Sequence, residues 1–200
     1  INANDGDDFV LADSSNLYIP DQSFANGSIA TALSLDTATS AWTVDENPLF
    51  GNSSIPHVTA IVESTIGQAE SFSVNVGAGE TLTADIDFSA SSPIGNGNDL
   101  IISILDSLGN VLVTNDDSVT SNGGLGSFDS LDSYLTYTPT SAGTYYLQIY
   151  PFGGSTFTSN NTFMLNVSVT GHVVGTGAVQ GNDIIDGGNG DDSIFAQGGL

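Results

Sequence analysis

The side chains of this chain that could do chemistry are its carboxylates. The 200 residues include 23 Asp and Glu, two His, no Lys and no Arg, which gives a formal net charge of −23 at pH 7. A buried charge is very costly unless it is paired, and the remaining partners are backbone N–H groups, water and metal ions. Such an excess of hard oxygen ligands favours Ca²⁺, which takes about six to eight oxygens from carboxylates, Asn side chains and carbonyls.

A nine-residue unit near the C-terminus spaces Gly and Asp regularly. Residues 187–195 read Gly-Gly-Asn-Gly-Asp-Asp-Ser-Ile-Phe and match the nonapeptide G-G-x-G-x-D-x-U-x at every fixed position. Residues 178–186 keep the fourth Gly, the sixth Asp and the eighth, apolar residue of the same unit. Glycine permits turns with φ > 0, and Asp at the sixth position supplies a hard ligand. Two successive units in phase indicate a true repeat, and a disordered acidic tail is the alternative.

This tail resembles the RTX, or haemolysin-type, calcium-binding repeat of bacterial proteins exported by type I secretion. The resemblance implies a short calcium-bound parallel β-roll at the C-terminus, with the apolar position of each unit packed inside. The metal-binding positions that it implies are Gly181, Asp183, Gly190 and Asp192.

The N-terminus carries a degenerate copy of the same unit. Gly6, Asp8 and Val10 have the spacing G-x-D-x-U. A copy at each end predicts a domain inserted into a β-roll, with the two ends stacked together. We therefore expect Asp8 to lie near Asp183 or Asp192 and to share calcium with one of them.

Apolar residues alternate with polar ones along the middle of the chain, as in half-buried strands. Residues 72–76 and 82–88 alternate on either side of Gly77-Ala78-Gly79, which predicts a hairpin, and residues 29–35 could form a short helix. Residues 100–105 are continuously apolar, as in a strand buried on both faces, and a turn at 106–110 leads into 111–114. Later strands are expected at 134–138, 145–150 and 163–169.

Short strands at this regular spacing predict an all-β fold, an antiparallel, jelly-roll-like β-sandwich followed by the short parallel β-roll. We expect a lead-in with the degenerate half repeat at 1–20, a ligand-binding sandwich at 21–170, and a linker with truncated repeats at 171–200. We also expect the chain to be a fragment of a longer protein.

A series of loose motifs runs through the predicted sandwich in a fixed order. They are Glu70-Ser71-Phe72-Ser73-Val74, Gly79-Glu80-Thr81-Leu82, Asn98-Asp99-Leu100, Leu105-Asp106-Ser107-Leu108-Gly109, Asn115-Asp116-Asp117-Ser118, Asp132-Ser133-Tyr134-Leu135 and Ala142-Gly143-Thr144-Tyr145-Tyr146-Leu147. In this order they make residues 47–170 similar to the bacterial pre-peptidase C-terminal (PPC) domain. That resemblance implies a non-catalytic β-sandwich that binds calcium and, in several members, peptide or protein ligands.

Together with the RTX tail, the resemblance points to an adhesin. Similar modules of long RTX adhesins look like they capture the free C-terminus of a surface protein, with Ca²⁺ taking its terminal carboxylate. A Ca²⁺ ion that is held in a loop and has an open coordination position would allow a strongly acidic surface to bind an anion. The implied cofactor is Ca²⁺, and the implied partner is a peptide or protein on another cell surface.

The loop after residue 114 is the expected calcium site of the sandwich. Its candidate ligands are Asn115, Asp116, Asp117, Asp129 and Asp132, with Asp99 at another strand edge. The alternative is a solvated acidic loop without a metal.

Aromatic residues in a later connection are the candidate ligand contacts. Residues 151–161 join two expected strands and carry Phe152 and Phe157, which could form a wall for a ligand side chain. Folding of both rings back over the edge of the sandwich is the alternative. Tyr134, with Asp116 and Asp117, completes the predicted ligand-binding set.

The sequence gives no support for catalysis. It has no H-E-x-x-H, no G-x-S-x-G, no P-loop and no Cys, so we expect no enzyme and no catalytic residue, although paired carboxylates leave a glycosidase open by composition. The negative charge argues against nucleic acid and anionic membranes. We therefore expect a monomeric calcium-dependent ligand-binding module, outside the cell or attached to its surface. A purely structural calcium-rigidified spacer and a calcium-dependent carbohydrate-binding module are the alternatives.

Overall fold

A computed structural model of the chain describes residues 9–12, 16–19, 27–38, 42–44, 54–90, 97–159, 161–174, 190 and 193–196. The predicted all-β class is confirmed, since the described residues form twelve strands with one four-residue α-helix and one 3₁₀ turn. Among the residues described, no helix is long and apolar enough to cross a membrane.

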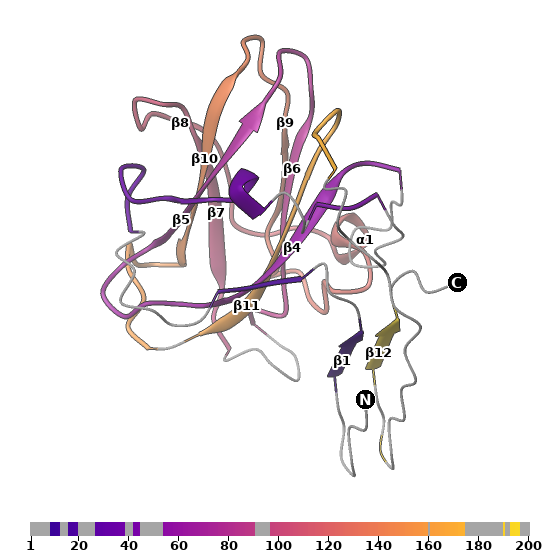
Figure 1. The fold of residues 1–200 in the computed structure, drawn as a ribbon. Coiled ribbons are helices and arrows are strands. Elements are labelled where there is room, and N and C mark those ends of the chain that lie inside the picture. Colours follow the sequence, from indigo (N-terminus) through magenta and orange to yellow (C-terminus); the bar gives the residue numbers. More distant parts are fainter. Residues whose placement is uncertain are drawn as a thin grey trace.

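Two five-stranded sheets lie face to face and form a sandwich (Figure 1). The first has the order β3-β5-β10-β7-β8, with β3 at Leu33–Ser34, β5 at Glu70–Val76, β10 at Gly143–Pro151, β7 at Leu100–Leu105 and β8 at Val111–Asn115. The second has the order β2-β4-β11-β6-β9, with β2 at Asn16–Ile19, β4 at His57–Glu63, β11 at Thr162–Val169, β6 at Leu82–Asp87 and β9 at Tyr134–Tyr137. The neighbours pair antiparallel except β2 with β4 and β3 with β5.

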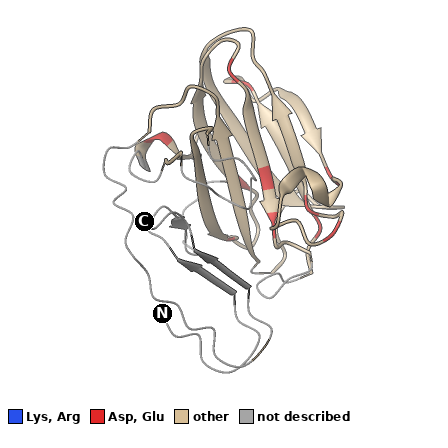
Figure 2. Cartoon of the chain, turned by 90° about the vertical axis from the view of Figure 1, so that its right-hand side faces the viewer, with Lys and Arg blue, Asp and Glu red and all other residues tan. Residues whose placement is uncertain are grey.

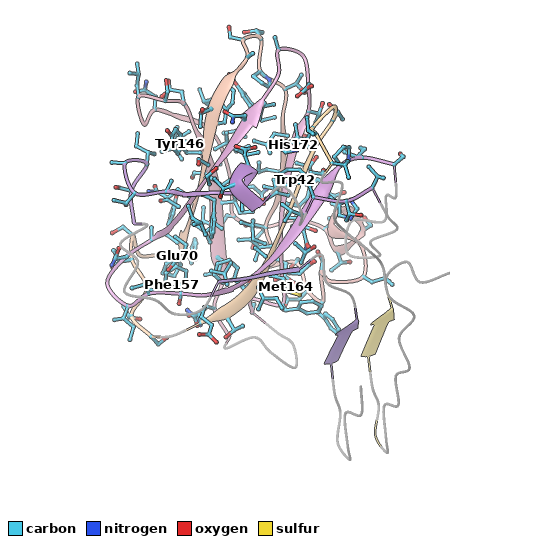
Figure 3. All side chains as sticks on the ribbon, in the orientation of Figure 1. Trp42, Glu70, Tyr146, Phe157, Met164 and His172 are labelled. Carbon is cyan, nitrogen blue, oxygen red and sulfur yellow. The ribbon has the colours of Figure 1, made fainter. Side chains whose placement is uncertain are left out.

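The core lies between the sheets because alternate side chains of each strand point inward. Its fully buried large side chains are Trp42, Phe72, Phe88, Phe157, Phe163, Leu35, Leu82, Ile86, Leu100, Ile102 and Ile104. Burial of one such side chain stabilises the fold by about 1.5–3 kcal/mol. Trp42 also donates its indole N–H to the carbonyl of Leu35, at 3.0 Å, and stacks on His172 with ring centroids 3.6 Å apart (Figure 3).

The two ends of the described chain come together beside the sandwich. β1 (Phe9–Ala12) and β12 (Ser193–Ala196) form a two-stranded parallel sheet, with Phe9 opposite Ser193 and Val10 opposite Ile194 (Figure 1). Val10 and Ile194 are the apolar eighth residues of the N-terminal copy and of the C-terminal unit, so the two copies pair in phase. This confirms the predicted stacking of the two ends.

Two local predictions are wrong. β5 and β6 do not form a hairpin, because the Gly77–Gly79 turn carries the chain from one sheet to the other, where β5 pairs with β10 and β6 with β11. The alternation of apolar and polar residues shows which face of a strand is buried. It is the same in both strands and does not show which sheet each strand joins. Residues 29–35 also form no helix; they contain a turn and the short strand β3, which pairs with β5.

The remaining elements are short. The 3₁₀ turn η1 covers Asp36–Ala38, and the helix α1 covers Thr120–Gly123 in the connection between β8 and β9. This α1 connection, residues 116–133, contains four of the six metal ligands predicted for the sandwich. The helix α1 itself lies against β6 (Figure 1).

Candidate metal centre

Three carboxylates meet at one edge of the β7–β8 hairpin. Asp99 precedes β7, and Asp116 and Asp117 follow β8. Because the two strands are antiparallel, with Ile102 opposite Asn115, the start of β7 and the end of β8 lie side by side. One ligand oxygen of each Asp lies within 4.8 Å of those of the other two. We call these residues the Asp99 cluster.

Hydrogen bonds from neighbouring residues fix the backbone of the Asp99 cluster. The Ser133 hydroxyl lies 2.5 Å from the carbonyl oxygen of Asp116 and 2.7 Å from that of Leu100, and so ties the two strands together. Asn115 donates its side-chain amide to the carbonyl of Asp117 at 3.0 Å, and its Oδ1 accepts the N–H of Tyr134 at 3.1 Å. The structure therefore gives Asn115, a predicted metal ligand, the role of positioning the loop.

The Asp99 cluster is short of partners for its charge. Oδ1 of Asp99 and Oδ1 of Asp116 are buried, and neither has a hydrogen-bond partner among the described residues. Burial first, and then the charges of Asp116, Asp117 and Asp129, raise the pKa of Asp99 to about 6. Burial and the charge of Asp117 also raise the pKa of Asp116. Unpaired oxygens of like charge fit a hard divalent cation such as Ca²⁺.

The other predicted ligands of the loop have different positions. Asp129 is close enough to raise the pKa of Asp99, and its Oδ1 accepts the N–H of Leu131 at 2.8 Å. Asp132 is not part of the Asp99 cluster: it is 1 % exposed, and its oxygens accept hydrogen bonds from the backbone of Ser89 and Phe128. Its charge acts instead on Asp85 and Asp87, two buried residues of β6.

The predicted aromatic wall is wrong for Phe157, and the ligand contact of Phe152 stays a prediction. Phe152 is 61 % exposed. Its backbone N–H donates to the carbonyl of Asp99 at 2.8 Å, so Phe152 lies beside the Asp99 cluster. Phe157, labelled in Figure 3, is 1 % exposed, which makes it a core residue. Its ring stacks on that of Phe163. A loop connection does not reveal in sequence which of its aromatic rings folds inward. Tyr134 is half-buried and lies opposite Asp85 in the β6–β9 pair.

Most predicted ligands of the repeats lie outside the described residues. These are Asp8, Gly181, Asp183 and Asp192. Gly190 is described, and its φ of 144° belongs to the region that glycine alone adopts readily. The predicted sharing of calcium between Asp8 and a C-terminal Asp stays a prediction.

Asp85 and Asp87 are the residues that sequence analysis missed. Both are 0 % exposed, although their alternation with Ala84 and Ile86 is typical of a strand with one face in water. The sequence signal is weak: two Asp on one face of a strand, in a chain without Lys or Arg. Figure 2 shows acidic segments on the strands and in loops, with no Lys or Arg on the ribbon.

Comparisons with known proteins detect one family domain within this fold. A bacterial pre-peptidase C-terminal domain is detected at residues 68–151, which include β5 to β10 and the Asp99 cluster, so the predicted resemblance is confirmed over this range. No curated protein sequence matches the chain. Among solved structures, the crystal structure of Aeromonas hydrophila PliG, a periplasmic lysozyme inhibitor of g-type lysozyme, is similar with 14 % identity and a TM-score of 0.40. The match covers 58 % of this chain and 88 % of PliG.

In EGTA, the thermal stability of the chain should fall as the pH rises from about 4, the ordinary pKa of an Asp side chain, to about 6. A carboxyl whose pKa is raised on folding contributes stability that is fully present below its unfolded pKa and is lost as the pH rises through the folded pKa, which is about 6 for Asp99. Melting curves of the wild type and of Asp99→Asn at several pH values check this. The variant should show a shallower decline, and equal slopes would contradict the assignment.

Proposed function

We propose that this chain is a calcium-dependent ligand-binding module of a secreted or surface-attached bacterial adhesin of the RTX type. In this proposal the module is not catalytic, and the Asp99 cluster holds the ion. The observation that carries the proposal is the meeting of three carboxylates with buried, unpartnered oxygens on Asp99 and Asp116. No Lys or Arg in the chain can neutralise them.

The surroundings of the Asp99 cluster suit the binding of a peptide C-terminus. A bound Ca²⁺ would reverse the local field and accept a carboxylate from outside. The exposed ring of Phe152 would meet the apolar part of the ligand, because its backbone is bonded to that of Asp99. Asp116 and Asp117, at the end of β8, would supply the carboxylates on the other side of the hairpin.

The pairing of β1 with β12 supports display of the module over a purely structural spacer. The two strands run parallel and side by side, so the polypeptide enters and leaves the sandwich on one side. A domain connected in this way adds little length to a longer chain. It does present its surface away from that chain, as an adhesin requires.

The peptide-binding proposal predicts a dependence on both calcium and the free carboxylate. Short peptides with a free C-terminus should bind in calcium and not in EGTA. Their amidated forms lack the carboxylate that would bind the ion, and a loss of about 1.4 kcal/mol or more would weaken their affinity at least about tenfold. Isothermal titration calorimetry measures both effects. Equal affinity for the free and amidated peptides would overturn capture of a carboxylate.

A matched pair of variants locates the site. Asp116→Asn should abolish the calcium-dependent binding of the peptide. Asp106→Asn removes the same charge at the far end of β7, roughly 20 Å away at about 3.3 Å per residue, and should bind normally. If both variants bind equally well, the Asp99 cluster is not the site. Binding on a glycan array without any peptide binding would favour the carbohydrate-binding alternative.

A further inference from the structure

Two carboxylates outside the Asp99 cluster are buried on the outer face of the second sheet. Asp85 and Asp87 lie two residues apart on β6, so both leave the strand on the face opposite Ala84 and Ile86, which face the core. The outer face of a sandwich normally meets water. Here both Asp residues are 0 % exposed, so another segment must cover them.

The glycine-rich part of the α1 connection provides this cover. A Cβ on Gly123 would lie 2.7 Å from Oδ1 of Asp85, and a Cβ on Gly126 would lie 2.1 Å from Oδ2 of Asp87. Real Cβ atoms essentially never approach so closely. The backbone of residues 123–126 therefore lies directly on the two carboxylates, and a larger residue would push it away.

The hydrogen bonds in this enclosure satisfy one Asp and not the other. Asp87 accepts the side-chain amide of Asn166 at 2.6 Å and the hydroxyl of Ser127 at 3.2 Å. Asn166 is itself bonded to Thr59 at 2.7 Å. Within the described part of the chain, neither oxygen of Asp85 has a hydrogen-bond partner.

A proton on Asp85 would not repair this. A protonated carboxyl donates through one oxygen only, so its other oxygen would still lack a hydrogen-bond donor among the described residues. Burial first, and then the charges of Asp87 and Asp132, raise the pKa of Asp85 well above its ordinary value. A cation bound at the enclosure would pair with both oxygens of Asp85 and offset the charge of Asp87 at once.

We propose that Asp85 and Asp87 bind a divalent cation of the calcium class between β6 and residues 123–127 of the α1 connection. This site is separate from the Asp99 cluster, which belongs to the β7–β8 hairpin, and it stands whether or not the module binds a peptide. Asp132, held by Ser89 and Phe128, adds negative charge beside it. The ion would fasten the α1 connection to β6.

Counting bound ions tests the second site in the whole chain. Wild type and variants are dialysed to equilibrium against calcium, and bound calcium per chain is measured by plasma mass spectrometry. Asp85→Asn keeps the shape of the side chain and should bind one ion fewer than the wild type. Asp99→Asn should also lose one ion, and the double variant two. Asp106→Asn, the charge-matched control, should lose none.

The outcomes separate the two sites. An unchanged ion count in Asp85→Asn would overturn the proposal. An Asn side chain has the shape of a neutral Asp85 but lacks the negative charge that would bind the ion. An unchanged count in Asp99→Asn alone would instead contradict the proposed function and leave this site intact.

A measurement on the wild type covers the case in which Asp85→Asn fails to fold, as judged by far-UV circular dichroism. Crystals grown with Tb³⁺ should give an anomalous peak between the carboxylates of Asp85 and Asp87. Ordered protein at this position without such a peak would overturn the proposal.

Discussion

Chelation of calcium with EGTA should lower the melting temperature of this chain by roughly 10–20 °C. A ligand that binds only the folded state at about 100 times its Kd stabilises it by about 2.7 kcal/mol, and 1 kcal/mol shifts the melting temperature of a chain of this size by about 2–4 °C. One ion therefore accounts for about 5–11 °C, and two ions, one at the Asp99 cluster and one at Asp85 and Asp87, account for about 11–22 °C. Differential scanning calorimetry in calcium and in EGTA measures it.

The physical reason is the repulsion that the folded state accumulates without cations. Asp85, Asp87 and Asp132 are all at most 1 % exposed, and no Lys or Arg exists to pair with them. Unfolding returns these carboxylates to water, where like charges no longer crowd one another. The double variant Asp85→Asn with Asp99→Asn should therefore respond less to EGTA than the wild type. An unchanged melting temperature in EGTA would contradict both proposed sites.

Replacing Phe157 by Ala should destabilise the fold by about 3–5 kcal/mol, the range for a buried Phe. The ring is 1 % exposed and lies 6.3 Å from that of Phe163, nearly parallel to it. Its backbone also joins the edge of the sandwich, since Gly67 donates to the carbonyl of Phe157 at 2.7 Å and Phe157 donates to that of Gln68 at 2.9 Å. Urea denaturation of both proteins, followed by Trp42 fluorescence, measures the loss of stability.

Phe152→Ala is the matched control within the same connection. Phe152 is 61 % exposed, and a surface substitution of this kind usually changes stability by less than about 0.5 kcal/mol. Its effect should appear in peptide binding instead, because the backbone N–H of Phe152 donates to the carbonyl of Asp99 in the Asp99 cluster. If Phe152→Ala proved as destabilising as Phe157→Ala, the division between a core ring and a surface ring would be wrong.

Local rules were enough to predict several features of this protein. Alternation of apolar and polar residues predicted the strands of the sandwich, because burial on one face imposes a period of two. The turn at 106–110 predicted the β7–β8 hairpin, and an antiparallel hairpin must bring the residue before its first strand close to those after its second. Thus Asp99, Asp116 and Asp117 could be grouped from sequence. The phase of the Gly and Asp repeats likewise anticipated the pairing of β1 with β12.

The sequence by itself determined that the carboxylates must find partners other than Lys or Arg, since composition does not depend on folding. Only the tertiary structure decided which carboxylates are buried without a partner for their charge. Asp85 and Asp132 are separated by 47 positions (132 − 85) and come together because β6 pairs with β9, which follows Asp132 in the chain. The same long-range packing buried Phe157, exposed Phe152 and sent β5 and β6 into different sheets. Alternation shows which face of a strand is apolar, but contacts between distant segments decide what covers the other face.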